Sequence, residues 1–300
     1  MARTESRAAR TKAASVDRVS KLSRAVLALV AIAVILQIAP AYIYWFGDIS
    51  SLKIYEAATE KRYIDQGGAP EPIESKIVKP IAYLNAPQLK DLNSSERKKR
   101  FIETILPSIL IVKHKREQER LLAIAIAGKF YPTRLERRFM RDLFEGYRVK
   151  NIDDLSLKML THPNSVAIAQ AALESAWGTS NVFLETNNMF GVWSFNINEP
   201  RHMIVVRGNK RQIFFRRYDS IYSSIEDYFK VVAIGKAFEG FRKARAESND
   251  SINLVGFLEA YSVQRKEYVR KLRYVIESND LTRFDDYSLD KESLFLKAAL

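Results

Sequence analysis

The sequence has no cysteine, only three histidines and 11 glycines among its 300 residues. Without thiols it has no disulfide scaffold, thiol nucleophile, cysteine-ligated zinc or iron–sulfur cluster. The three histidines are far apart in sequence and form no HExxH motif, so no metal site is predicted. The glycines form neither GxGxxG nor GxxxxGK[ST], which leaves dinucleotide and P-loop binding without support. No cofactor is expected.

The first 46 residues have the pattern of a membrane anchor. Residues 1–24 contain seven Lys or Arg and two acidic residues, a net charge of +5, and residues 26–46 contain no charge at all. A helix needs about 20 apolar residues to cross the hydrocarbon core of a bilayer. Aromatic side chains gather at the distal end of this stretch, as in an interfacial belt, at Tyr42, Tyr44 and Trp45.

This pattern predicts a cytoplasmic tail at 1–24, a transmembrane anchor at 25–46 and an exported body, because basic residues favour the cytoplasmic side. Two alternatives stay open. A cleaved signal peptide is possible because Ala39-Pro40-Ala41 offers small residues after the apolar stretch. A buried core helix is disfavoured by the length of the stretch.

The net charge of +13 does not by itself indicate a nucleic-acid partner. The basic cluster Arg97–Arg100 opens an amphipathic helical pattern with Phe101, Ile105 and Ile109, so a solvated helix face explains it. An exported basic domain is expected to meet an anionic membrane surface or a cell-wall polymer.

The remaining chain predicts a mainly helical domain with one small β-hairpin. Residues 47–92 hold several Gly and Pro and are predicted to be a linker, and Asn93 with Glu96 has the pattern of a capping box. Pro107 is expected to kink or break the first helix. Helical periodicity is present near 94–112, 115–127, 134–145, 153–160, 165–177, 222–234, 252–260 and 266–277, and the predicted hairpin strands are 203–207 and 212–218.

One carboxylate stands at the end of an almost wholly apolar helix. Residues 166–173 are apolar except Gln170, so this helix is expected to be buried. Glu174 shares a face with Ala167 and Ala171, and these small side chains leave room for a groove. Apolar surroundings raise the pKa of a carboxyl, so Glu174 could supply a proton to a glycosidic oxygen. It could instead pair with an arginine or cap a neighbouring helix.

Downstream, the stretch Asn187–Trp193 reads NNMFGVW and combines two amides with aromatic rings around a glycine. Amides can bind sugar hydroxyl and N-acetyl groups, and rings can stack on the apolar faces of sugars. The same residues could equally form a tight turn before a strand.

Together these residues resemble the glucosaminidase family of peptidoglycan hydrolases, and in particular its Bax-like branch. The resemblance covers about residues 100–282, with Met189 where Leu is usual and Trp193 where many relatives have Lys. The matching stretches are RFIETILP (100–107), AQAALESAWGTS (169–180), NNMFGVW (187–193), YDS (218–220), Tyr261-Ser262 and Glu267-Tyr268.

The resemblance implies a lysozyme-like α+β domain at 93–285, followed by a tail at 286–300, that cleaves the β-1,4 bond after N-acetylglucosamine. Glu174 matches the family's catalytic acid and Tyr261 a tyrosine of its groove. Glu199 is the candidate second acid, as the one Glu between positions 186 and 225. The expected substrate-binding residues are Trp177, Asn187, Asn188, Phe190, Trp193 and Tyr218.

The expected partners are peptidoglycan glycan strands and, through residues 25–46, the lipid bilayer, with no nucleic acid. The protein is expected in a bacterial inner membrane, with its N-terminus cytoplasmic and its catalytic domain periplasmic. The alternative is a wall-binding or scaffold protein that kept the fold and lost activity.

Overall fold

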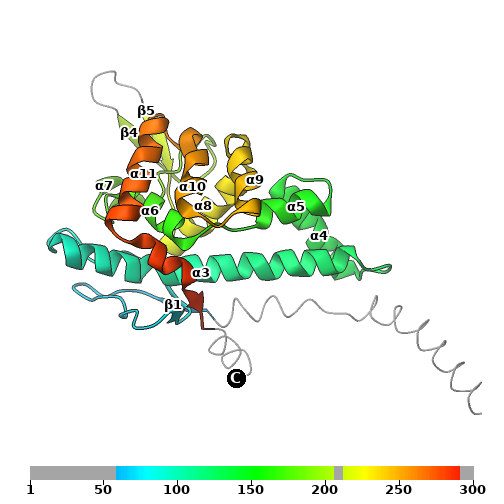
Figure 1. Cartoon of the computed structure of the whole chain (residues 1–300), viewed down its shortest axis with the longest axis horizontal. Helices are drawn as coiled ribbons and strands as arrows, with labels where there is room; N and C mark the ends of the chain where they lie inside the picture. Colours follow the sequence, from blue (N-terminus) through cyan, green and yellow to red (C-terminus); the bar gives the residue numbers. More distant parts are fainter. Residues whose placement is uncertain (1–58, 206–211, 291–300) are drawn as a thin grey trace, which may run out of the picture. The chain divides into compact units, whose positions relative to one another are not determined.

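The computed structural model describes residues 59–205 and 212–290, which are mainly helical with small strands (Figure 1). The α-helices of the described residues are α3 (Ser94–Ala127), α4 (Arg134–Tyr147), α5 (Ile152–Met159), α6 (Asn164–Ser175), α7 (Asn181–Thr186), α8 (Ile221–Ile234), α9 (Glu239–Glu247), α10 (Ser251–Leu254) and α11 (Lys266–Ser278). Short 3₁₀ helices are η1 (Lys236–Phe238), η2 (Val255–Tyr261) and η3 (Leu281–Asp286). The strands are β1 (Glu60–Arg62), β2 (Ile77–Val78), β3 (Ile81–Tyr83), β4 (Arg201–Val205), β5 (Gln212–Arg216) and β6 (Ser288–Leu289).

Helix α3 begins where the sequence predicts and continues past Pro107, the residue that was expected to kink or break it. Asn93 caps the helix, because its Oδ1 accepts a hydrogen bond of 3.0 Å from the backbone N–H of Glu96. Pro107 lies inside the helix, and the predicted break is wrong. Pro107 removes one backbone donor, but its whole neighbourhood from Phe101 to Val112 is buried, and this packing offsets the loss.

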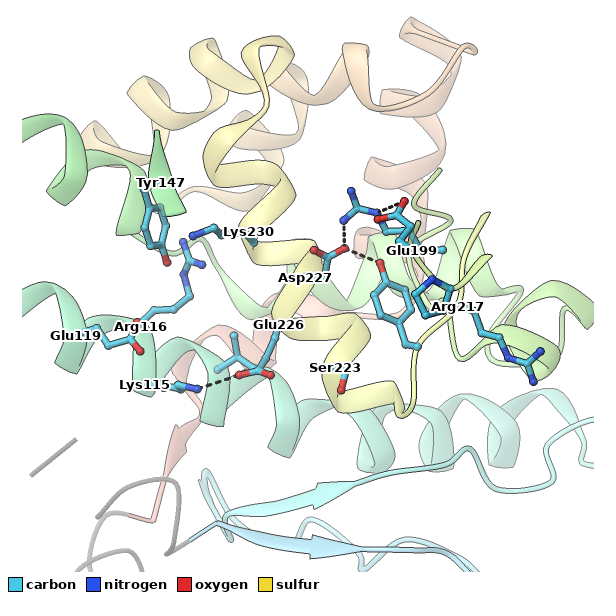
Figure 2. Close-up of a pocket in the computed structure, with 14 residues that line it drawn as sticks. Lys115, Arg116, Glu119, Tyr147, Glu199, Arg217, Ser223, Glu226, Asp227 and Lys230 are labelled. Carbon is cyan, nitrogen blue, oxygen red and sulfur yellow. Dashed lines mark hydrogen bonds and ion pairs between the residues drawn. The ribbon is translucent and has the colours of Figure 1, made fainter. Parts of the chain in front are cut away.

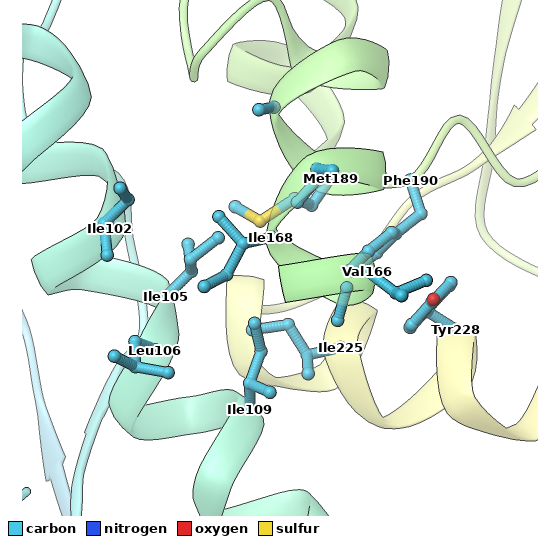
Figure 3. Close-up of a cluster of buried hydrophobic side chains, with 14 of the residues drawn as sticks. Ile102, Ile105, Leu106, Ile109, Val166, Ile168, Met189, Phe190, Ile225 and Tyr228 are labelled. Atoms are coloured by element: carbon cyan, nitrogen blue, oxygen red, sulfur yellow. The ribbon is translucent and has the colours of Figure 1, made fainter. Parts of the chain in front are cut away.

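The core forms where α6 packs against α3, α11 and η3. Figure 3 shows Ile105 and Ile109 of α3 facing Val166 and Ile168 of α6, next to Ile225 of α8. These five side chains are fully buried. The apolar helix expected from the sequence at 166–173 is therefore the centre of the domain.

Residues 59–92 do not behave as the predicted linker. Strand β3 pairs in parallel with β1 and contacts α3, and Val78, Ile81 and Tyr83 belong to the hydrophobic core. The prediction missed this because the Gly and Pro residues that suggested a linker separate short strands, of which β3 is fully buried. Positions 47–58 of the predicted linker lie outside the described residues.

The end of the chain also differs from the prediction. Strand β6, at Ser288–Leu289, pairs in parallel with β2, and Leu289 is buried. The predicted tail at 286–300 therefore contributes to the fold at its start. A two-residue strand carries no periodic signal, so only pairing across more than 200 positions reveals it.

The predicted hairpin is present as β4 and β5, which pair antiparallel from Arg201–Arg216 to Val205–Gln212. Among the described helices, none combines the length and the apolar character that crossing a membrane requires. The predicted tail and anchor at 1–24 and 25–46 lie outside the described residues.

Residues 128–139 belong to a second compact unit. The N-terminus of α4 starts in it with a capping box. The Thr133 hydroxyl accepts from the N–H of Glu136 at 3.1 Å, and the Glu136 carboxylate accepts from the N–H of Thr133 at 2.8 Å.

Candidate active site

Helix α6 ends in a tight left-handed turn that directs the chain away just after Glu174. Ala176, Trp177 and Gly178 all have positive φ, and the backbone N–H of Gly178 donates to the Ser175 hydroxyl at 2.9 Å. A Cβ at Gly178 would lie 2.9 Å from Leu89 Cδ1, so this position requires glycine for both conformation and space. Glu174 is thus held on the last turn of a rigid, buried helix.

A second turn, Asn187–Gly191, lies directly against Glu174. Asn188 is buried, and its side chain ties the turn together by accepting from Val192 N at 2.9 Å and donating to the backbone oxygens of Val192 and Arg216. Gly191 has φ +62°, and a Cβ there would lie 3.1 Å from Glu174 Oε2. The glycine of the NNMFGVW motif therefore lets the backbone approach the carboxyl closely.

Glu174 lines an open cavity of about 610 Å³, which we call the Glu174 groove. The groove is largely apolar, with Glu174 as its one carboxyl group and two arginines among its described lining residues. The other lining residues are Gly191, Val192, Trp193, Phe195, Arg216, Val231, Ala237, Phe238, Ala260, Tyr261, Ser262, Val263 and Arg265.

The Glu174 carboxyl has the electrostatic character predicted from the sequence. Burial raises the pKa of Glu174 to about 7, while a hydrogen bond with Tyr268 acts in the opposite direction. The described structure shows no ion pair to Glu174. A carboxyl with this pKa is substantially protonated near neutral pH and can donate a proton.

Two tyrosines stand beside Glu174. Tyr261 lines the groove, and its hydroxyl donates to the backbone oxygen of Phe190 at 2.9 Å. Tyr268 lies behind it, with the two rings stacked 5.5 Å apart. Tyr261 therefore lies in the groove lining, and its hydroxyl holds the Asn187–Gly191 turn.

The predicted sugar-stacking rings separate into two groups. Trp193 lines the groove and pairs with Phe215 in an isolated antiparallel bridge beside the hairpin. Phe190 is fully buried and stacks on Tyr228 at 3.8 Å, so its ring is core and has no free face for a sugar. Trp177 packs edge-on against Phe101 of α3, outside the groove lining.

The remaining predicted binding residues support the architecture instead of lining the groove. Asn187 donates its side-chain N–H to the backbone oxygen of Tyr218 at 3.0 Å. Tyr218 donates its hydroxyl to Asp227 at 2.6 Å. Both amides of the NNMFGVW motif are thus used in hydrogen bonds to the backbone, which matches the tight-turn alternative considered from the sequence.

Glu199 lies on a different cavity, which we call the charged pocket, of about 520 Å³. Figure 2 shows Glu199 near Arg217 and Asp227 at one end of this pocket, with Lys230 and Tyr147 at the other end. The Glu199 carboxylate faces Arg216, with 3.5 Å between Glu199 Oε1 and Arg216 Nε. The structure therefore does not bring Glu199 and Glu174 into one cavity, and Arg216, which also binds Asp227 at 2.6 Å, lines both.

Several groove residues had no signal in the sequence. Phe195 and Val263 are 85% and 83% exposed, although both are apolar. Arg265 has φ 52°, a strained backbone for a residue other than glycine. Hydropathy patterns identify apolar positions that are buried. They give no signal for exposed apolar residues on loops, which only the tertiary structure places together. Among the described residues, no group of three or more His, Asp or Glu could hold a metal ion.

The chain is similar to two curated bacterial proteins. Protein Bax of Escherichia coli strain K12 is 26% identical over 203 residues, which cover 62% of this chain and 71% of Bax. Exo-glucosaminidase LytG of Bacillus subtilis strain 168 is 25% identical over 146 residues, or 45% of this chain and 51% of LytG. The chain thus spans about half the length of LytG.

Two solved structures are also similar. The catalytic domain of the autolysin Auto from Listeria monocytogenes shares 24% identity, with a TM-score of 0.35 and coverage of 56% of this chain and 97% of that domain. A peptidoglycan hydrolase from Sphingomonas sp. A1 shares 22% identity, with a TM-score of 0.35 and coverage of 52% and 92%.

The family comparison covers the part of the chain that builds the Glu174 groove. Residues 151–281 match the glucosaminidase family, described as mannosyl-glycoprotein endo-beta-N-acetylglucosaminidase. This range contains α6, the Asn187–Gly191 turn, the hairpin and all of α11. Residues 151–281 therefore form a domain of the glucosaminidase family, and the protein is a glycoside hydrolase.

Proposed function

We propose that the protein is a peptidoglycan hydrolase that cleaves the β-1,4 bond after N-acetylglucosamine, with Glu174 as its general acid. The observation that carries this proposal is the Glu174 carboxyl itself, which lines an open groove and has a pKa of about 7. The glucosaminidase domain and the relative LytG, an exo-glucosaminidase, support the choice of substrate.

In this mechanism Glu174 transfers its proton to the glycosidic oxygen as the bond to the anomeric carbon breaks. The leaving sugar departs as an alcohol, and water bonds to the anomeric carbon of the other sugar through an oxocarbenium-like transition state. The proton that this water releases restores the protonated Glu174 for the next turnover. The apolar groove favours the protonated form before the transfer. The Glu174 carboxylate left behind stabilises the positive charge nearby.

The groove offers apolar surfaces for the sugar faces. Trp193 and Phe195 lie on the hairpin side, with ring centroids 6.2 Å apart, and Tyr261 lies on the helical side. Rings placed in this way suit the apolar faces of pyranose sugars. We assign the stacking role to Trp193 and Phe195 in place of Phe190 and Trp177.

The role of second carboxylate stays with Glu199 as a proposal. Glu199 is paired with Arg216, which also lines the Glu174 groove. Glu199 Oε1 and Arg216 Nε are both buried without a hydrogen-bond partner, so this ion pair is loose. Glu199 would reach the groove only if its loop moved over Arg216 when the glycan binds.

We also propose that residues 25–46 anchor the protein in a bacterial inner membrane, with the catalytic domain in the periplasm. The uncharged stretch after a basic tail supports this orientation. Reporters for cytoplasm and periplasm fused to the C-terminus test it. A signal only from the cytoplasmic reporter would refute export, and a shortened soluble product would replace the anchor with a signal peptide.

Incubation of the purified protein with peptidoglycan sacculi tests the activity. We expect new reducing ends at N-acetylglucosamine, identified by mass spectrometry of the released fragments, and none from Glu174→Gln. Sacculus binding without cleavage by wild-type protein would instead support the scaffold alternative, which the single carboxyl in the described groove lining keeps open.

A further inference from the structure

A chain of polar side chains extends from Glu174 into the core. His162, Gln170, Tyr228 and Tyr268 are each at most 2% exposed, yet they are linked to one another by hydrogen bonds. His162 Nε2 lies 2.8 Å from the Tyr228 hydroxyl, which lies 2.6 Å from Gln170 Oε1. Gln170 Nε2 lies 3.1 Å from the Tyr268 hydroxyl, which is hydrogen-bonded to the Glu174 carboxyl. We call these five residues the buried chain.

The chemistry of Gln170 gives the buried chain a direction. The amide oxygen only accepts and the amide nitrogen only donates. With the oxygen toward Tyr228, the Tyr228 hydroxyl donates to Gln170, so His162 must be the donor to Tyr228. With the nitrogen toward Tyr268, the Tyr268 hydroxyl accepts from Gln170, so its own proton is free for Glu174. In each hydrogen bond of the buried chain, the acceptor then lies on the side nearer to Glu174.

The distances favour this direction over the reverse. The short contact, 2.6 Å, suits O–H···O and the longer one, 3.1 Å, suits N–H···O. Exchanging the two amide atoms would place an N–H donor at the short distance. His162 agrees with the same sense, because its Nδ1 is buried without a partner and is better tolerated there as a bare ring nitrogen than as an unpaired N–H.

The surroundings of His162 keep its ring neutral. Its ring stacks on Phe229 at 4.9 Å and meets Phe241 edge-on at 5.3 Å. Burial lowers its pKa well below the ordinary value, and the nearby cations Arg245, Lys113 and Arg116 act in the same direction. A neutral His162 has one N–H, and the buried chain places it on Nε2.

We propose that the buried chain is a positioning device, which presents the Tyr268 hydroxyl to Glu174 as a fixed donor and leaves the other carboxyl oxygen to carry the acidic proton. This inference rests on the proposed role of Glu174 as general acid. Without Gln170, the Tyr268 hydroxyl could turn and accept the proton of Glu174. The acid would then hold its proton toward the core, away from the glycosidic oxygen.

The pH dependence of activity separates positioning from simple packing. Arg216, Arg265 and Tyr261 line the groove with Glu174, and Tyr268 contacts it from behind. A donor to the carboxylate favours the charged form, so removing that donor raises the pKa of Glu174. Tyr268→Phe is expected to raise it by about one unit, which moves the loss of activity to higher pH.

Gln170→Met keeps the volume and removes both amide contacts. We expect kcat to fall about tenfold with little change in KM, and the pH midpoint to rise in the same direction by less than in Tyr268→Phe. Tyr228→Phe removes the hydrogen bond to the Gln170 amide oxygen and is expected to shift the pH midpoint least. Unchanged midpoints in Tyr268→Phe and Gln170→Met would overturn the proposal, even if both variants were less stable.

Ser175→Ala is the matched control. Ser175 is fully buried next to Glu174 and donates to the backbone oxygen of Ala171 at 2.6 Å, but it lies outside the buried chain. We expect a lower melting temperature and an unchanged pH midpoint. A shift equal to that of Gln170→Met would mean that any local loosening moves the pKa, which contradicts a specific chain.

A second measurement keeps this test separate from the proposed function. Carbon-13 NMR titration of labelled glutamate, with Glu174→Gln for assignment, reports the pKa of Glu174 without any turnover. If wild-type protein cleaves no glycan, the hydrolase proposal fails, while a higher pKa in Tyr268→Phe and Gln170→Met would still support the buried chain. If cleavage is normal and the titrations coincide, the buried chain fails alone.

Discussion

Glu174 and Glu199 are both partly buried glutamates near the hairpin, but their surroundings differ in kind. Glu174 lies in an apolar groove without a cation partner, and its pKa rises to about 7. Glu199 lies in the charged pocket and faces Arg216. Burial alone therefore does not make an acid catalyst. A carboxyl has to be desolvated and also lack an ion pair that would hold its ionised form.

The largest expected effect is the loss of activity in Glu174→Gln. The amide keeps the shape and the hydrogen bonds but cannot supply a proton, so kcat should fall about 10²- to 10⁴-fold. Release of reducing ends from sacculi measures it, with circular dichroism to confirm folding. Glu199→Gln is the matched variant and should lose far less. Equal losses of activity in the two variants would contradict this difference and make Glu199 a full catalytic partner.

Phe190→Ala tests whether the Phe190 ring belongs to the hydrophobic core beside Glu174 or contacts the glycan. Its ring is fully buried against Tyr228, so truncation should lower the free energy of unfolding by about 3–5 kcal/mol. Denaturant unfolding measures this. A fully stable variant with weakened glycan binding would instead return Phe190 to the substrate-contact role predicted from the sequence.

The raised pKa of Glu174 sets the direction of the pH dependence. A general acid works when protonated, so activity should be present at acidic pH and be lost as pH rises through about 7. Above the midpoint the rate should fall about tenfold per pH unit. The initial rate on solubilised glycan between pH 5 and 9 gives the profile. A midpoint near the ordinary glutamate value would contradict the desolvated groove.

Gly191→Ala tests the close approach of the turn to Glu174. The new methyl group would lie 3.1 Å from Glu174 Oε2, at φ +62°. We expect a stability loss of about 1–3 kcal/mol from the backbone conformation, together with lower kcat because the carboxyl is displaced. Gly67→Ala is the control for backbone strain, since φ there is +77° and no atom lies within 4 Å of the new methyl group. An active Gly191→Ala enzyme would show that the turn does not fix the carboxyl.

Trp193→Ala is expected to have the smallest effect. The ring lines the groove and is only partly buried, so its loss should weaken glycan binding by about 0.5–1.5 kcal/mol, seen mainly in KM. Phe215→Ala, at the position that pairs with Trp193 in the bridge, controls for damage to the hairpin. A change in kcat alone would argue that Trp193 orders the site and does not hold the sugar.

Local patterns were enough to predict most of the helical framework. The Asn93 cap, the apolar helix around 166–173, the hairpin and the pKa direction of Glu174 all follow from short-range sequence and are present in the structure. The predicted break at Pro107 is absent, because the unfavourable helix propensity of one proline is outweighed by the burial of the helix around it.

The sequence by itself determined which carboxyl stands on an apolar helix, because a periodicity of 3.6 residues records which face is buried. Only the tertiary structure decided which aromatic rings face the groove, since Phe190 and Trp193 are three positions apart in one motif and have opposite surroundings. It also decided that Glu199 pairs with Arg216, and that His162, Tyr228 and Tyr268 meet around Gln170. Hydrogen bonds between residues 58 to 98 positions apart depend on how helices pack, and no local pattern records that packing.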